Sequence, residues 1–192
     1  MGFFCILACS GFAGAEPLTN WTANYPPCNR PSELLKHGPL NLGVRFTTAN
    51  PVLADQFKAA LNFWSKILDL AWYEDDTQNC SVQLADGQRD LFVAAPDIMA
   101  ARSQFPDRLG FQGGIAFNPS IRLSKTALFR ISVHEIGHML GLRHSANTRS
   151  LMYGLDLECS ESLDADDLAT LASHHKLRLT SLTEPVTLTR FR

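Results

Sequence analysis

The stretch His134 to Ser145, HEIGHMLGLRHS, constrains this chain more than any other part of its sequence. Two histidines lie four residues apart, and a third follows six residues later, beyond a glycine. On an α-helix the first two stand one turn apart on one face, about 6 Å along the axis. Both imidazoles can then reach one metal ion at about 2.0–2.1 Å. The spacing therefore predicts a helix that supplies two metal ligands.

The third histidine completes the predicted site. Gly141 permits a positive φ and a sharp exit from the helix. His144 can then approach the same ion from another direction, while Glu135 lies beside the ligand face and is suited to hold a water. We predict one zinc ion, the ligands His134, His138 and His144, and the catalytic residue Glu135. Chance occurrence of the full pattern in such a chain is on the order of a few per cent.

The N-terminus predicts export. Residues 2–15, GFFCILACSGFAGA, form a short apolar run, and Ala13-Gly14-Ala15 before Glu16 is a signal-peptidase pattern. No Lys or Arg precedes the run, so a buried helix and a truncated gene start stay as alternatives. A lipid anchor on Cys9 is a further alternative, and the run is too short to span a bilayer as a mature helix. We expect a secreted or periplasmic protein.

The rest of the chain suits one compact domain. The whole chain has 192 residues, of which 45% are hydrophobic and 19% charged, and its net charge is −2. This composition supports one core and gives no basic face for nucleic acid. The predicted parts are a signal peptide (1–15), an N-terminal extended segment (16–38), a domain that contains the metal motif (39–178) and a C-terminal tail (179–192). We expect a monomer without a transmembrane segment.

Hydrophobic periodicity predicts the elements of this domain. Strands are expected at 40–47, 70–74, 81–85 and 114–117. Asn50 and Pro51 mark a helix start, and apolar residues at helical spacing extend that helix over 51–69. The second major helix starts near Ser124 and ends about Leu140. Residues 87–110 are expected to be irregular, with a short strand at 90–94 as an alternative.

At the metal motif the chain resembles the metzincin zinc endopeptidases, and within them the matrixins. Ser150–Gly154, SLMYG, is similar to their methionine turn, with Met152 as its methionine. Ser145 follows the third histidine as in matrixins, and 163–168, LDADDL, is similar to the start of their final helix. The segments 101–106 and 113–118 are similar to the loop and edge strand ahead of their active-site helix. The resemblance implies an α+β metzincin fold with a twisted mixed sheet, an antiparallel edge strand, an active-site helix and a C-terminal helix.

The resemblance also implies a secreted zinc-dependent endopeptidase. Zinc would activate a water, and Glu135 would take the water's proton and pass it to the leaving amine. Met152 would pack under the metal without binding it. An extended polypeptide substrate would lie along the strand near 114–118 and pair with its backbone. Residues 153–160 would line the specificity pocket.

Two other functions stay open. One is a catalytically silent zinc-binding interaction protein, against which Glu135 counts. The other is a zinc hydrolase of non-protein amides, against which the third histidine and Met152 count. A structural zinc site of the matrixin type is not expected, because residues 38–133 contain no histidine. Calcium is possible but not indicated, since the acids of the 87–110 segment are more simply exposed loop residues.

The remaining cysteines and histidines have simpler explanations. Of Cys28, Cys80 and Cys159, two are expected to pair in an oxidising compartment. Cys28, in PPCNRP, is favoured as a disulfide partner; the open alternative is a thiolate on zinc, because matrixins keep a propeptide cysteine in a partly similar motif. The pair at 174–175 is expected to face solvent at the end of the final helix.

Overall fold

A computed structural model of the chain describes residues 30–31, 39–76, 82–86, 92, 99–103, 110–111, 113–154, 162–178 and 186–188. The predicted signal peptide at 1–15 and the three cysteines Cys28, Cys80 and Cys159 lie outside the described residues. The alternative strand at 90–94 does so too, except for Phe92.

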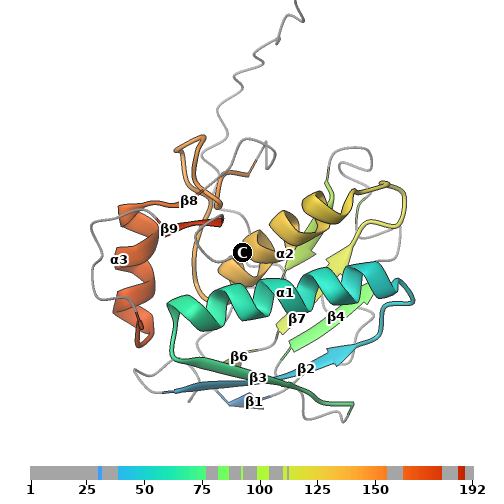
Figure 1. Ribbon diagram of the computed structural model, residues 1–192, viewed down its shortest axis with the longest axis horizontal. Coiled ribbons are helices and arrows are strands. Elements are labelled where there is room, and N and C mark those ends of the chain that lie inside the picture. Colours follow the sequence, from blue (N-terminus) through green and yellow to red (C-terminus); the bar gives the residue numbers. More distant parts are fainter. Residues whose placement is uncertain are drawn as a thin grey trace, which may run out of the picture.

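The described part of the chain contains short strands and three helices, joined by loops (Figure 1). The strands are β1 (Arg30–Pro31), β2 (Leu40–Phe46), β3 (Leu70–Glu74), β4 (Val82–Asp86), β5 (Ala101–Ser103), β6 (Gly110–Phe111), β7 (Gly113–Phe117), β8 (Ser162–Leu163) and β9 (Val186–Thr187). The helices are α1 (Pro51–Ile67), α2 (Lys125–Met139) and α3 (Ala165–His174). The strands and helices predicted from periodicity are all present, with ends that differ by one or two residues.

The main sheet has five strands in the order β3-β2-β4-β7-β5. The first four are parallel, with Leu40 opposite Leu70 and Leu84 opposite Ile115. Strand β5 alone runs antiparallel to its neighbour β7. Parallel neighbours need a crossover connection, and α1 provides it between β2 and β3. The predicted mixed sheet with an antiparallel edge strand is therefore confirmed.

The identity of the edge strand corrects one prediction. The strand near 114–118 was expected to be the edge and to pair with substrate. In the sheet, β7 lies between β4 and β5, and residues 115–117 face a partner strand on both sides. Strand β5 is the outermost strand beside it. The periodicity of 101–103 gave no signal, because a three-residue strand is too short to display alternation.

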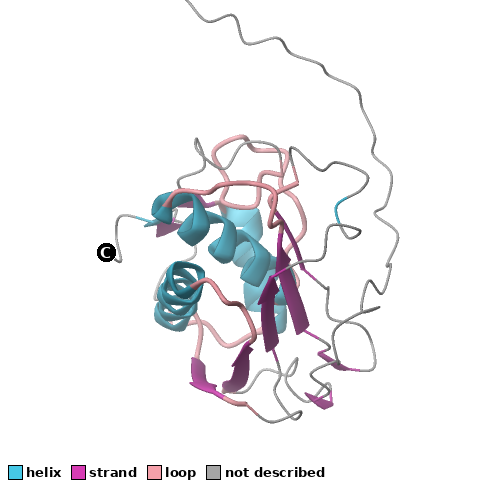
Figure 2. Cartoon of the chain, turned by 90° about the vertical axis from the view of Figure 1, so that its right-hand side faces the viewer, coloured by secondary structure: helices cyan, strands magenta, loops and turns pink. Residues whose placement is uncertain are grey.

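Helices α1 and α2 cover one face of the sheet, as Figure 2 shows from the side. Asn50 caps α1 through its side-chain oxygen, which accepts from the backbone N–H groups of Val52 and Leu53. The buried face of α1 and the inward side chains of β2 and β4 form one continuous core. Its members include Leu42, Val44, Phe57, Trp64, Leu84 and Ile115. No helix among the described residues is long and apolar enough to cross a bilayer.

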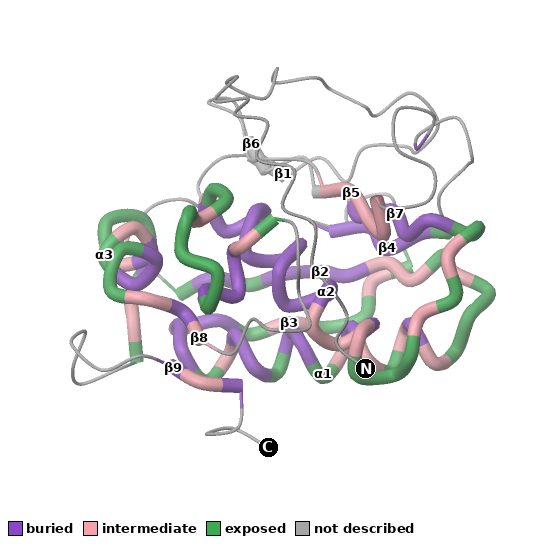
Figure 3. Tube along the Cα trace, turned by 90° about the horizontal axis from the view of Figure 1, so that it is seen from above, coloured by how far each residue is buried: buried purple, intermediate pink, exposed green. Residues whose placement is uncertain are grey.

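Helix α2 differs from α1 in being enclosed over most of its length (Figure 3). Every residue from Ile131 to Leu140 is buried, including the polar ones. The indole N–H of Trp64 on α1 donates to the backbone oxygen of Val133 on α2, at 3.1 Å. This bond fixes α1 against α2 at the residue before His134, so the first predicted ligand sits on a rigid part of the core.

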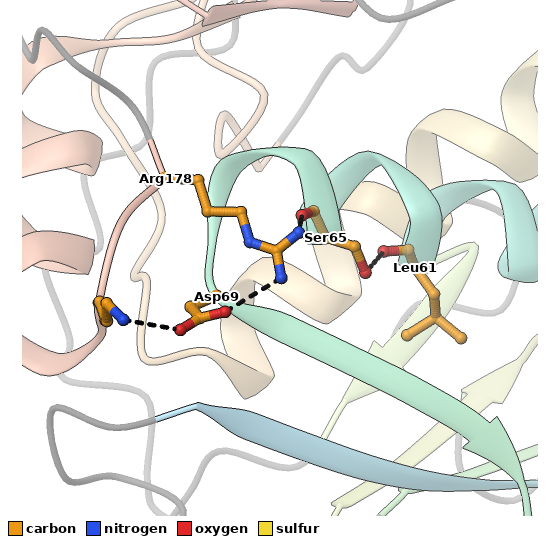
Figure 4. A network of polar contacts seen from close by, with 5 residues as sticks. Leu61, Ser65, Asp69 and Arg178 are labelled. Carbon is orange, nitrogen blue, oxygen red and sulfur yellow. Dashed lines mark hydrogen bonds and ion pairs between the residues drawn. The ribbon is translucent and has the colours of Figure 1, made fainter.

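The chain after α3 is tied to the end of α1, as Figure 4 shows. The guanidinium of Arg178 donates to the backbone oxygen of Ser65 and to the carboxylate of Asp69. Lys176 pairs with the same carboxylate at 3.0 Å. These two cations hold the pKa of the Asp69 carboxyl below its usual value. These contacts hold the segment that follows α3 against the turn between α1 and β3.

Part of the predicted C-terminal tail contributes to the fold. Strand β9 pairs with β8 just ahead of α3, and Val186 and Leu188 are buried in the main core. The remaining residues of 179–192 lie outside the described residues. Sequence analysis missed this pairing because β8 and β9 have only two residues each, too few to show a period.

Candidate metal centre

Helix α2 brings the first two predicted ligands together. Ser124 caps the helix by accepting from the backbone N–H of Ala127. His134 and His138 stand one turn apart and are only 4% and 5% exposed. Their ring centroids are 4.6 Å apart. Burial disfavours the charged form of an imidazole, and the neutral form is the one that binds metal.

Backbone carbonyls orient both rings. Nδ1 of His134 lies 2.7 Å from the oxygen of Leu151, and Nδ1 of His138 lies 2.9 Å from the oxygen of Leu142. A carbonyl only accepts, so each Nδ1 must be protonated and donate. Each Nε2 is then left with its lone pair for a metal ion. The fold therefore sets the tautomer of both rings in the form that zinc requires.

The chain leaves α2 in the way that the sequence predicts. Gly141 has φ +98°, in the left-handed region that favours glycine. The N–H of Leu142 donates to the oxygen of Gly137, and the N–H of Gly141 donates to the oxygen of His138, both at 3.0 Å. These two bonds form a Schellman motif, which satisfies the last helical carbonyls. The chain turns sharply there and returns towards the two histidines.

His144 completes the cluster from this returning segment. Its ring centroid lies 5.3 Å from that of His134 and 4.7 Å from that of His138. One ligand nitrogen from each ring lies within 4.8 Å of the others. Tetrahedral zinc with ordinary bond lengths separates its nitrogen ligands by about 3.3 Å, so small ring adjustments suffice. Among the described residues this is the one cluster of three or more potential ligands, and its donor set fits zinc.

Burial, and then the neighbouring His134, lowers the pKa of His138 to about 3. The ring therefore stays neutral throughout the physiological pH range without help from a metal. A ligand that is already deprotonated does not have to release a proton when zinc binds. His138 is thus already in the neutral form that binds a cation.

Met152 lies directly under the ligand helix. It is fully buried, and a Cβ built on Gly137 would come within 2.6 Å of its sulfur. The same Cβ would lie 3.4 Å from the Trp64 ring. Met152 thus occupies the groove that the missing side chain of Gly137 leaves, one residue before His138. This agrees with the packing expected of Met152 from the matrixin resemblance.

Glu135 lies on α2 between the two helical ligands and is 7% exposed. It is adjacent to His134, as the motif requires. A buried acid beside a three-histidine site has the chemistry of a general base. Its catalytic role stays a prediction.

Sequence reasoning missed the contacts that hold the loop between His144 and Met152. Ser150 donates from Oγ to Asp167 on α3 at 2.7 Å, and its Oγ accepts from the N–H of Met152 at 2.9 Å. Burial raises the pKa of the Asp167 carboxyl. Asp164 and Asp167 also form a capping box at the start of α3. The spacing Asp-x-x-Asp could have indicated the box, but not its contact with the loop.

The expectation for the histidine pair at the end of α3 is wrong for one member. His174 is exposed, as expected, but His175 is 4% exposed and lies against the end of α2. Its Nε2 is 2.8 Å from the oxygen of Leu140. The position after the last helical residue turns this side chain inward, which the helical period does not reveal. Neither histidine joins the metal cluster among the described residues.

The protein-family model described as Matrixin matches residues 45–175 of the chain. Macrophage metalloelastase of Rattus norvegicus is 38% identical over 85 residues, which are 40% of this chain and 18% of that protein. Stromelysin-2 of Rattus norvegicus is 28% identical over 133 residues, or 64% of this chain and 28% of that protein. Matrix metalloproteinase-21 of Cynops pyrrhogaster is 31% identical over 105 residues, which are 50% of this chain and 17% of that protein. The chain thus spans less than a third of the length of these relatives.

Proposed function

The chain belongs to the matrixin family, whose model matches more than half of its residues, and on this premise we propose that it is a zinc-dependent endopeptidase. The metal ligands of this proposal are His134, His138 and His144, and the general base is Glu135. One observation supports it above the others. Three imidazoles converge within reach of one ion, and carbonyl groups already orient two of them.

The chemistry divides between the ion and the chain. A zinc ion with three imidazole ligands supplies Lewis acidity, which polarises a carbonyl and makes water more acidic. Glu135 takes a proton from the attacking water while the water oxygen bonds to the scissile carbonyl carbon. It then passes a proton to the amine nitrogen as the C–N bond breaks. The carbonyl groups behind His134 and His138 keep these two rings in one orientation throughout.

The substrate is proposed to be an extended polypeptide that lies along β5. This strand is the outermost one beside β7, and it runs next to α2. A peptide added to the outer side of a sheet gains backbone hydrogen bonds whatever its side chains. Its scissile bond would then lie close to the ligand helix. This placement replaces the one on 114–118, which β4 and β5 enclose.

Glu135→Ala tests the proposal. The variant should still bind one zinc ion, because all three ligands remain, and it should cleave unfolded casein at least about a hundredfold more slowly. Glu74→Ala is the matched control, since Glu74 pairs with Lys58 at the far end of β3. Metal content and casein cleavage, with and without a chelator, are the measurements. Near-normal cleavage by Glu135→Ala would contradict the assigned base.

The wild-type chain separates the alternatives in the same assay. Zinc binding without cleavage would point to a silent interaction protein. Turnover confined to non-protein amides would point to a different hydrolase. Two tightly bound zinc ions per chain would contradict the expected single site.

We also propose export, followed by a monomeric state. The support is the apolar run at 2–15 and its Ala13-Gly14-Ala15 ending. The mature chain should then begin at Glu16. N-terminal sequencing of protein recovered from a secreting host tests the cleavage site, and light scattering tests the mass.

A further inference from the structure

The start of α3 meets the loop that follows the third histidine. Asp164 is the N-cap of α3, and its Oδ1 accepts from the backbone N–H of Asp167 at 2.9 Å. Its other oxygen, Oδ2, accepts from Oγ of Ser145 at 3.2 Å and from the side-chain amide of Asn147 at 3.3 Å. One carboxylate oxygen therefore caps the helix, and the other holds the loop.

The residues that Asp164 holds lie directly after His144. The backbone N–H of Ser145 donates to the oxygen of Met152 at 2.8 Å, so Ser145 also joins the two ends of the loop. Its Oγ accepts from the N–H of Asn147 at 3.1 Å. A displacement of Ser145 would move the neighbouring His144, whose side chain is exposed and does not have the enclosure of the helical ligands.

We propose that Asp164 is a positioning residue for His144: through Ser145 and Asn147 it fixes the backbone that presents the third ligand. This inference rests on the proposed function, because it assigns Asp164 to the same metal site. The side chain of Asp164 accepts hydrogen bonds from Ser145, Asn147 and Asp167, so its proposed effect on His144 passes through the backbone of the loop. Asp164 thereby holds the imidazole of His144 in place before zinc binds, so less of the loop has to become ordered on binding.

An asparagine at 164 separates the two tasks of the carboxylate. Asparagine caps helices about as well as aspartate, so α3 keeps its start. Its amide nitrogen cannot accept from the amide of Asn147. Asn147 cannot resolve this conflict by turning its own amide, because its oxygen already accepts from the N–H of Arg149 at 3.0 Å. Asp164→Asn therefore places one donor against another.

The first measurement is the rate at which zinc leaves the loaded protein for an excess of chelator. Asp164→Asn should release zinc about tenfold faster than wild type, with Tm unchanged within about 2 °C. Asn50→Ala is the matched control, because it removes the N-cap of the remote α1. It should lower Tm by about 2–4 °C and leave the release rate unchanged. Wild-type release from Asp164→Asn, or equally fast release from Asn50→Ala, would overturn the inference.

A double substitution tests the named contact. Asn147→Ala removes one of the two facing amides, so the acceleration in the double variant should be smaller than the accelerations of the two single variants combined. Additive acceleration in the double variant would mean that the two residues act independently, which would contradict the proposal. Circular dichroism of each variant establishes that α3 is retained.

A metal-free measurement distinguishes this inference from the proposed function. Hydrogen exchange of the Ser145 amide, which the loop protects, should be about tenfold faster in Asp164→Asn and unchanged in Asn50→Ala. A wild-type chain that binds zinc without cleaving casein would reject the endopeptidase function and leave the release test intact. A wild-type chain without zinc would reject the site itself, and unchanged Ser145 exchange would reject the role of Asp164 separately.

Discussion

The two helical histidines and the loop histidine of the predicted metal centre are held by different means. On α2, His134 and His138 are placed by the helical repeat, buried on all sides and oriented by carbonyl oxygens. His144 lies on the irregular segment 141–154, exposed, and placed by a turn and by side chains from α3. The proposed site would therefore combine a rigid pair of ligands with a third ligand whose position depends on contacts distant in the sequence. Each region should respond differently to the same kind of change.

Removal of a proposed ligand should give the largest loss of zinc binding. The accompanying change in stability should differ between a helical histidine and the loop histidine. His138→Ala and His144→Ala should each weaken zinc binding by more than about a hundredfold. This exceeds the usual loss of affinity when a residue that only supports a ligand is replaced. Only His138→Ala should also lower the free energy of unfolding of the metal-free protein, by about 1–3 kcal/mol, because it opens a cavity and removes the bond to Leu142. Zinc titration and denaturant unfolding measure the two effects.

The exposed His174 is the control for these substitutions. His174→Ala should change neither zinc affinity nor stability by a measurable amount. If it weakened zinc binding as much as His144→Ala does, the third ligand would be misassigned.

Acid should destabilise the metal-free protein through the helical region. Folded His138 takes up its proton near pH 3, whereas in the unfolded chain it does so near the ordinary value of 6.5. The unfolded state therefore binds more protons between these values, and stability falls as the pH drops through that window, by up to about 1.4 kcal/mol per pH unit. Asp167 acts in the opposite sense, since its raised pKa lowers stability as the pH rises through it.

Denaturant unfolding of the chelator-treated protein at several pH values measures this slope. His138→Asn provides the comparison, because asparagine does not titrate and its amide nitrogen takes the place of Nδ1, so it can still donate to Leu142. The slope between pH 6.5 and 4 should be smaller in the variant. An identical slope in both proteins would show that His138 titrates normally in the folded state.

Two glycine substitutions should give the smallest effects and the clearest contrast. In Gly137→Ala the new Cβ would lie 2.6 Å from the sulfur of Met152, which is fully buried. Overpacking costs about 1–3 kcal/mol, and the better helix propensity of alanine offsets part of it. We expect a net loss of about 1 kcal/mol in the free energy of unfolding, with zinc binding little changed.

In Gly154→Ala the new Cβ would lie 3.1 Å from two atoms of the His144 ring. The ring must move by a few tenths of an ångström, so zinc affinity should fall by roughly threefold to tenfold. Stability should change by less than about 0.5 kcal/mol, because both residues are exposed. If Gly154→Ala lowered stability and Gly137→Ala lowered zinc affinity, the loop and not the helix would be the tightly packed region.

The elements with a strong local signal were predictable. The cap at Asn50, the period of α1, the ligand spacing on α2 and the exit at Gly141 each depend on residues within a turn of one another. Local geometry decides such features, so the sequence alone indicated the two long helices, four of the strands and the three histidines of the predicted site. The same local logic failed for β5, which has too few residues to show a period.

Tertiary structure decided the rest, because it depends on contacts between residues far apart in the chain. It placed β5 rather than β7 at the sheet edge, turned His175 inward and brought β9 against β8. It also joined Asp164 to Ser145 across 19 positions and Ser150 to Asp167 across 17. No repeat or propensity encodes such pairs, since their formation depends on how the whole core closes. The sequence therefore determined which residues could bind a metal, and the fold decided what holds the third of them in place.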